Sequence, residues 1–362
     1  KGINIIIYYM KIKSILSGTL LLLSTCSLSS QDRVWTMQDC IDYAMENNIS
    51  LKMSRNNYLS GLQDSQRAKA AMFPTLSASA SQNVSASAWG EGGTTRYGGS
   101  YGLNSALTLY NGGRLKNALK QQEALNMVDS LSLEENRITI CTQIVQAYLQ
   151  CLYAEESVKA AESTAEVSKA QKERAEELLK AGSISKVDLS QLESQYVSDC
   201  YQVTTARNSL QNYRLQLKQL LELDILDEMA IAGYEASDNE VFALLPDKVT
   251  VYNNALDYMP QVERTEYSTK AAELSLKQAE AGFLPSVSLS AGLGTSNSSG
   301  ASFISQLGNN LNASGGLTLS VPIFSARENK TAVAKAKIAL DNSLLEEKSV
   351  EKEILKEVEN TY

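Results

Sequence analysis

The sequence has no histidine among its 362 residues, and it has 41 Asp and Glu against 33 Lys and Arg. The lack of imidazole excludes His-based catalytic triads and removes the commonest zinc ligand and the usual general base near neutral pH. A formal net charge of −8 argues against nucleic-acid binding, which needs a basic surface to neutralise phosphates. We therefore expect no enzyme: no catalytic residue, no cofactor, no bound metal ion and no nucleic-acid partner.

The N-terminal region has only a short apolar run, residues 15–23, which is too short to span a bilayer as a helix. Because a basic segment precedes this run and small polar residues follow it, the pattern is typical of a secretory signal peptide. We assign residues 1–30 to upstream residues plus this signal peptide, and we expect an exported protein. Residues 23–26 resemble a lipoprotein box with a poorly fitting Thr25, so lipidation of Cys26 and ordinary cleavage both remain open.

Four further cysteines, Cys40, Cys141, Cys151 and Cys200, do not resemble a disulfide framework. Cys141 and Cys151 are ten residues apart on one predicted helix, a separation of about 15 Å that no disulfide bridges. We expect these two to be small core residues.

Lys, Asp and Glu are absent from four stretches of alternating apolar and small polar residues, which predict strands at about 75–89, 97–110, 286–295 and 311–323. A period of two gives each strand one apolar and one polar face, and each stretch is long enough to cross a bilayer as a tilted strand. A soluble sheet also alternates, but its outer face carries charges. Because the polar faces here are Ser, Thr, Asn and Gly, we favour membrane strands that line water.

The remaining sequence is helical. Residues 113–180 contain no Pro and no internal Gly, which predicts a helix of about 100 Å. Gly182 ends it, a second helix follows over residues 187–223 with Ser183 or Ser185 as its N-cap, and the two helices form a hairpin over 113–223. The apolar residues that we expect to pack along the first helix step by three, four and seven, namely Leu131, Ile138, Cys141, Val145, Tyr148 and Leu152.

The element order is repeated along the chain. Phe73-Pro74 matches Leu284-Pro285 at an offset of 211 residues, and Tyr110-Asn111 matches Phe324-Ser325 at 214. We therefore divide the chain into a first repeat, residues 31–235, and a second repeat, residues 236–362. The second repeat has no last hairpin, so that the sequence is either a fragment or a copy that has lost this part.

Four strands cannot close a membrane barrel, and open strand edges cannot face lipid because their backbone groups would lack hydrogen-bond partners. Other copies of the chain must therefore complete the sheet. Two chains give eight strands, whose interior fills with side chains, whereas three give twelve, which can leave a pore. The small side chains of the polar face favour three.

The chain resembles the TolC family of outer-membrane efflux proteins. The residues that carry the resemblance are Trp35-Thr36-Met37-Gln38-Asp39-Cys40-Ile41, Ala44-Met45-Glu46-Asn47-Asn48, Phe73-Pro74, Leu109-Tyr110-Asn111-Gly112-Gly113-Arg114, Ala181-Gly182-Ser183 with Val187-Asp188, and Val321-Pro322-Ile323-Phe324. The resemblance implies an α+β membrane protein, in which long antiparallel helical hairpins form an α-barrel continuous with a four-strand contribution to a trimeric, twelve-stranded transmembrane β-barrel.

The resemblance also implies a function, a location and partners. The chain would be a homotrimer in outer-membrane lipid, with its helices in the periplasm, and would act as the passive exit duct of a tripartite efflux or type I secretion system. A periplasmic adaptor (membrane fusion) protein and an inner-membrane RND or ABC transporter would be its partners. The sequence does not name the transported substrate.

Two sets of residues are implied as sites. Ala181, Gly182, Ser183 and Asp188 at the hairpin tip would dock the adaptor, although turn chemistry alone also accounts for them. The residues at the strand–helix junctions are Pro74, Gly112, Gly113, Pro285 and Pro322. The second repeat has Ala326-Arg327 where the first has the glycine pair, so we expect its turn to differ.

Two other classes of protein compete with the duct. One is a non-channel coiled-coil envelope protein, structural or adhesive, which the charge-free strands argue against. The other is an exported hydrolase with Asp188 and Glu193 as acid and base, but no nucleophile context accompanies these carboxylates.

Overall fold

The computed structural model describes residues 34–86, 95–224, 226, 229–233, 246–298 and 303–361. The expected signal peptide with Cys26, and the end of the first expected strand with Trp89, lie outside these residues. The chain forms two compact units, one of Lys1–Glu46 with Gln143–Ala236 and the other of Asn47–Thr142 with Ser237–Tyr362. No helix in the described ranges combines the length and the apolar character that a membrane-spanning helix needs.

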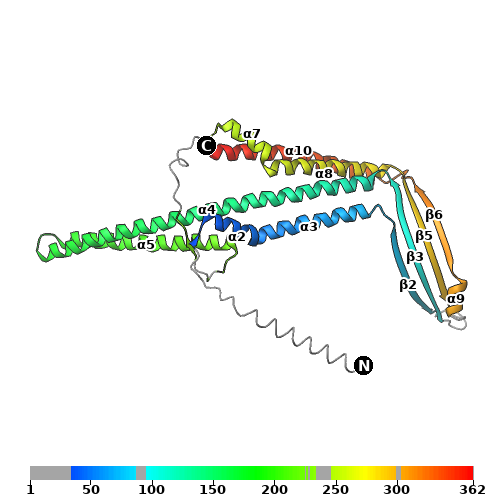
Figure 1. Cartoon of the computed structure of the whole chain (residues 1–362), viewed down its shortest axis with the longest axis horizontal. Helices are drawn as coiled ribbons and strands as arrows, with labels where there is room; N and C mark the ends of the chain where they lie inside the picture. The colour runs from blue at the N-terminus through cyan, green and yellow to red at the C-terminus, as the bar shows by residue number, and fades with distance from the viewer. Residues whose placement is uncertain are drawn as a thin grey trace, which may run out of the picture. The chain divides into compact units, whose positions relative to one another are not determined.

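The second unit contains a four-stranded antiparallel sheet (Figure 1). Its strands are β2 (Thr75–Ala86), β3 (Thr95–Asn111), β5 (Ser286–Ser298) and β6 (Asn312–Ser320), and they lie in the order β2-β3-β5-β6. Each begins and ends within three residues of its expected bounds wherever the structure describes them. The two hairpins are therefore joined through β3 and β5, whose pairing connects the two halves of the sequence.

The register of the sheet aligns the four alternating patterns. Leu103 of β3 pairs with Ala78 of β2 and Leu293 of β5, and the next residue, Asn104, pairs with Ser77 and Gly292. Because directly opposed residues of antiparallel strands point to the same side, the apolar positions of neighbouring strands share one face. Since β5 and β6 continue this register, the sheet has one apolar and one polar face.

Helices adjoin the sheet at one end of its strands (Figure 1). They are α3 (Ile49–Ala70), the first part of α4 (Arg114–Lys180), α8 (Pro260–Glu280) with the short η1 (Ala281–Phe283), and α10 (Glu328–Thr361). A further helix, α7 (Lys248–Tyr258), lies at the end of α8 that is away from the sheet (Figure 1). Val350, Ile354 and Val358 of α10 form a buried cluster against apolar residues of α7.

Polar contacts also join these helices. The Asn136 amide of α4 donates to the hydroxyls of Ser50 and Ser54 of α3, at 3.0 and 2.9 Å. The guanidinium of Arg264 on α8 contacts the Glu135 carboxylate of α4 at 2.8 Å.

The first unit is built around the rest of α4, together with α2 (Met37–Asn47) and α5 (Lys186–Leu221). Two short strands, β1 (Val34–Trp35) and β4 (Ala230–Ile231), pair in parallel beside them. The phenol of Tyr148 is buried, and its oxygen lies 2.7 Å from the Ala232 carbonyl and 3.1 Å from the Trp35 carbonyl. Tyr148 thus connects α4 to both strand segments, and burial raises the pKa of its hydroxyl group.

The expected packing face of α4 is partly wrong. Between residues 140 and 154 its buried residues step by four and three, as in a coiled coil, but they are Ile140, Ile144, Ala147, Cys151 and Ala154, with Tyr148 beside them. Of the expected residues only Tyr148 is buried, while Ile138 is 51% exposed. The physical reason is that α4 carries apolar residues on more than one side, so sequence spacing alone does not select the side that its neighbours cover.

The expected burial of the cysteines on α4 is likewise only partly correct. Cys151 is buried as expected, which raises the pKa of its thiol to about 11, whereas Cys141 is only half-buried. Among the described residues, Cys40, Cys141, Cys151 and Cys200 form no disulfide.

Candidate functional site

The apolar face of the sheet is uncovered. Its large side chains are exposed, with Leu76 at 76% and Leu103 at 46%, and the others are Val84, Tyr97, Leu289, Leu293, Leu317 and Leu319. A contiguous apolar surface of this kind is rare on a soluble monomer and marks an interaction with lipid or protein. No charged residue lies among these positions, which suits contact with hydrocarbon.

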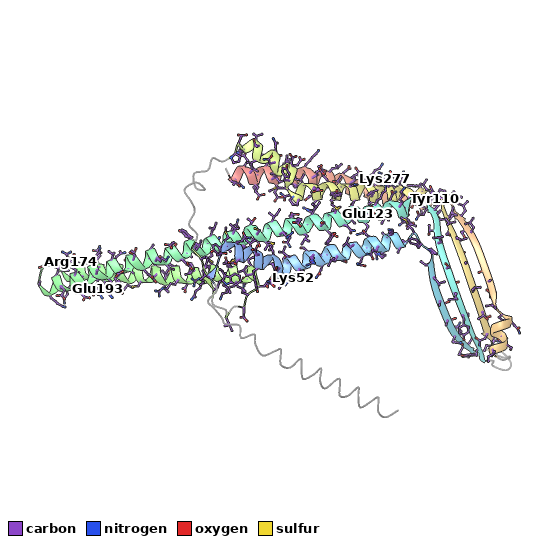
Figure 2. All side chains as sticks on the ribbon, in the orientation of Figure 1. Lys52, Tyr110, Glu123, Arg174, Glu193 and Lys277 are labelled. Atoms are coloured by element: carbon purple, nitrogen blue, oxygen red, sulfur yellow. The ribbon has the colours of Figure 1, made fainter. Side chains whose placement is uncertain are left out.

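Exposed aromatic residues mark the end of the sheet that adjoins the helices. Phe73 precedes β2, Phe283 precedes β5, and Phe324 follows β6. Tyr110 lies where β3 approaches α4 (Figure 2). A bulge at Leu109 shifts the register of β3 by one residue, so that Tyr110 pairs with Val287 on the apolar face. This arrangement is typical of the aromatic girdle of a membrane sheet.

The polar face consists of small uncharged side chains over most of its length. The Ser81 and Ser100 hydroxyls lie 2.7 Å apart on neighbouring strands, and Gly102 and Gly292 add no side chain. Such residues hydrogen-bond with water and leave space beside the sheet, so this face suits the wall of a water-filled passage.

Both outer strands, β2 and β6, pair on one side only in the part of the chain that the structure describes. The last residues of β5 extend past β6, and there α9 (Phe303–Asn309) replaces a strand. The Gln306 side chain accepts from the Ser298 N–H at 2.6 Å and donates to the Ser298 carbonyl at 2.9 Å, and Asn310 donates to the Ser296 carbonyl. The chain thus covers this edge of β5 but leaves the edges of β2 and β6 for other strands.

The junctions between strands and helices depend on proline and glycine. Pro74 and Pro285 directly precede β2 and β5, and proline, which has no N–H, does not continue a helix. Gly112 and Gly113 link β3 to α4 at φ of +66° and +81°. A Cβ on Gly112 would lie 2.8 Å from the Leu284 Cβ, so this position requires glycine for both its conformation and its packing.

The expectation that the second junction would differ is wrong for the backbone. After Pro322, Ala326 and Arg327 have φ of +44° and +74°, in the places that correspond to Gly112 and Gly113. These two residues adopt a left-handed conformation that is costly for any residue with a Cβ. The connection from β6 to α10 therefore imposes a positive φ on Ala326 and Arg327, although residues with a Cβ prefer a negative φ.

The hairpin tip has the geometry of two standard caps. Gly182 has a φ of +75°, and the N–H groups of Gly182 and Ser183 bond to the carbonyls of Leu179 and Leu178, each at 2.9 Å. Ser185, and not Ser183, is the N-cap of α5, and it forms a capping box with Asp188. The hydrogen bonds from the Ser185 hydroxyl and N–H hold the pKa of Asp188 below its usual value.

A shallow cavity of about 320 Å³ lies beside this turn. It is lined by Ala175, Leu178, Ile184 and Leu192, with Arg174 and Asp188 among its polar residues. Figure 2 shows Arg174 on α4 and Glu193 on α5 close to the end of the hairpin. Because the Asp188 carboxylate is bound within its own cap, the geometry does not support an acid–base pair of Asp188 and Glu193.

The described residues contain no group of three or more Cys, Asp or Glu placed to hold a metal ion. An uncovered apolar sheet with a charge-poor polar face, joined to long helices, defines a class of outer-membrane protein.

The chain belongs to the outer membrane efflux protein family, which matches residues 40–222 and 251–362. The resemblance to TolC-like proteins and the location in the outer membrane are thereby confirmed. This is a family of efflux proteins and not of enzymes.

Individual relatives agree with this assignment. The cation efflux system protein CusC of Escherichia coli O157:H7 is 25% identical over 310 residues, which are 84% of this chain and 65% of CusC, so the chain spans under two thirds of that relative. A crystal structure of CusC superimposes with a TM-score of 0.75 at 22% identity, over 89% of this chain and 73% of that chain. The Campylobacter jejuni CmeC outer membrane channel gives 0.75 at 19% identity, over 87% and 67%. These likenesses confirm the expected fold class.

Sequence reasoning missed two features of the site. It did not find the side-chain amides of Gln306 in α9 and of Asn310 directly after it, which cover the edge of β5, although Gln and Asn in an otherwise apolar and small segment were a signal. It also did not predict the bulge at Leu109, which has no signature in the alternation and which pairs Tyr110 with Val287.

Proposed function

We propose that this chain is the outer-membrane exit duct of a tripartite efflux or type I secretion system. The observation that carries the proposal is the sheet, with an uncovered apolar face, a face of small polar residues and unpaired edges on β2 and β6. Open edges are not tolerated in lipid, so strands of other copies pair with them. A non-channel envelope protein would have no reason to expose this apolar face.

The number of copies follows from the strand count. Three chains of four strands give twelve strands, which leave a water-filled passage, whereas eight strands fill their own interior. The homotrimer is therefore the assembly that fits the small side chains of the polar face. The junction residues Pro74, Gly112, Gly113, Pro285 and Pro322 set the direction in which the helices leave this sheet.

The hairpin tip is our proposed docking site for a periplasmic adaptor, with Ala181, Gly182, Ser183 and Asp188 as the contact residues. Two observations support it. A Cβ on Gly182 would meet no atom within 4 Å, so the turn faces open space. An apolar cavity with the charged groups of Arg174 and Asp188 adjoins it. The adaptor would in turn contact an RND or ABC transporter, which supplies the energy.

Conductance across a lipid bilayer tests the duct. We expect the protein, extracted from outer membranes with detergent, to open ion-conducting pores in planar bilayers. In the N104C variant, a charged thiol reagent added from water should reduce this conductance, because Asn104 lies on the polar face. The matched control is L103C, one residue away on the apolar face, which should not respond. Assembled trimers that do not conduct, or protein that high salt removes from membranes without detergent, would refute the duct.

Cross-linking tests the docking site. A photoreactive group on A181C should capture the adaptor, and the same group on V197C should not, since Val197 is 65% exposed on the same hairpin but away from the turn. Equal capture of the adaptor at both positions would refute docking at the hairpin tip and would leave the proposal of an exit duct standing.

A further inference from the structure

The polar face of the sheet carries one charged residue among the described strand residues, Arg96 near the start of β3. It lies at the end of the sheet that is opposite to the helices. Arg96 pairs with Ser85 of β2, which places it on the polar face, and its side chain is exposed. It forms no ion pair with any residue that the structure describes.

A cavity of about 500 Å³ surrounds this position. Arg96, Asn83, Ser85, Ser100 and Ser298 contribute polar groups to its lining. Gly98, which pairs with Asn83 and Ser298, also lines the cavity and adds no side chain to it. Tyr97, Gly99 and Asn297 complete the lining. A Cβ on Gly98 would come no closer than 3.4 Å to a neighbouring atom.

The chemistry of this cavity suits an anion. A guanidinium group keeps its positive charge at any physiological pH and donates several hydrogen bonds, and hydroxyl and amide groups beside it add further donors. The sequence has one other charged residue in residues 75–111 and none in residues 286–320. That residue is Glu91, which lies outside the described part of the chain.

We propose that Arg96 forms a site for small anions at the outer mouth of the duct and makes this mouth prefer anions over cations. The inference rests on the proposed function, because three copies around one passage place three Arg96 side chains at its exit. Solutes leave through this ring, so Arg96 attracts anionic solutes to the exit and repels cations that would enter from outside.

The reversal potential of the wild-type pore in a gradient of KCl tests this inference, with chloride as the probe anion. In R96Q we expect the permeability ratio of chloride to potassium to fall roughly two- to fivefold at 0.1 M salt, and further in R96E. The comparison variant is E91Q, which removes the negative charge of Glu91, five residues before Arg96 in the sequence, and should keep or raise the ratio. Conductance with the same ratio in R96Q would overturn the inference and leave the duct intact, whereas no conductance from assembled wild-type trimers would refute the duct.

A second measurement does not depend on conductance. In S85C, placed directly opposite Arg96, an anionic thiol reagent should react several-fold faster than a cationic one of the same size, relative to their rates with a free thiol. In S85C combined with R96Q this preference should disappear. Equal relative rates in both variants would show that Arg96 does not set the local potential, and the inference would be wrong.

Discussion

A lysine should have opposite effects on membrane insertion at two neighbouring positions, Leu103 on the apolar face of the sheet and Asn104 on its polar face. Leu103 is the middle residue of β3, pairs with Ala78 and Leu293 on the apolar face, and is 46% exposed. A lysine on the lipid-facing side of a membrane strand costs about 2–4 kcal/mol at the bilayer midplane. Leu103→Lys should therefore shift the equilibrium between inserted and non-inserted protein by about 30- to 1,000-fold per chain. In a trimer the cost is incurred three times.

The assay is the fraction of protein that resists extraction by high salt and migrates as an assembled trimer on a gel without boiling. We expect Leu103→Lys to lose nearly all of this fraction. Asn104→Lys, which adds the same charge on the polar face, should keep it within a factor of a few, and Leu103→Met should keep it as well. Equal retention by both lysine variants would refute the assignment of the apolar face to lipid, and selective loss in Asn104→Lys would invert it.

Two further predictions concern the junction and the hairpin tip. Ala326→Gly should stabilise the protein by about 0.5–1 kcal/mol in urea unfolding, since Ala326 has a φ of +44°. The control, Ala332→Gly within α10, should destabilise the protein by about 1 kcal/mol. A loss of stability in Ala326→Gly would contradict the strain argument. The pKa of Asp188 is lowered from 3.8 in the folded protein, so its cap stabilises α5 above that pH and is lost as the pH falls through the folded value. Asp188→Asn should therefore speed amide exchange in the first turn of α5 at a pH well above 3.8, and the difference from wild type should shrink as the pH falls through the lowered pKa. A difference independent of pH would show that the carboxylate charge is not responsible.

Much of this architecture follows from local sequence chemistry. The absence of Pro and internal Gly predicts one helix over 113–180, and α4 spans Arg114–Lys180. Gly182 ends that helix because glycine adopts a left-handed conformation without strain, and Ser185 with Asp188 begins the next one. The alternation of small polar and apolar residues predicts the strands and their two faces. These features depend on residues within a few positions of one another, so one sequence is sufficient to find them.

Other features depend on segments that are far apart in the chain. Only the pairing of β3 with β5 joins the two alternating hairpins into one sheet, and only that pairing produces the bulge that turns Tyr110 to the apolar face. The neighbours of α4 select Ile144 and Cys151 as buried residues from several apolar stripes that the sequence offers equally. Likewise, Ala326 and Arg327 are left-handed because the chain must pass from β6 into α10, although nothing in their local chemistry favours it. Local chemistry therefore determined the helices and strands and the polarity of their faces. Tertiary pairing decided which faces meet, because contacts between distant residues outweigh local conformational preferences of about 1 kcal/mol per residue.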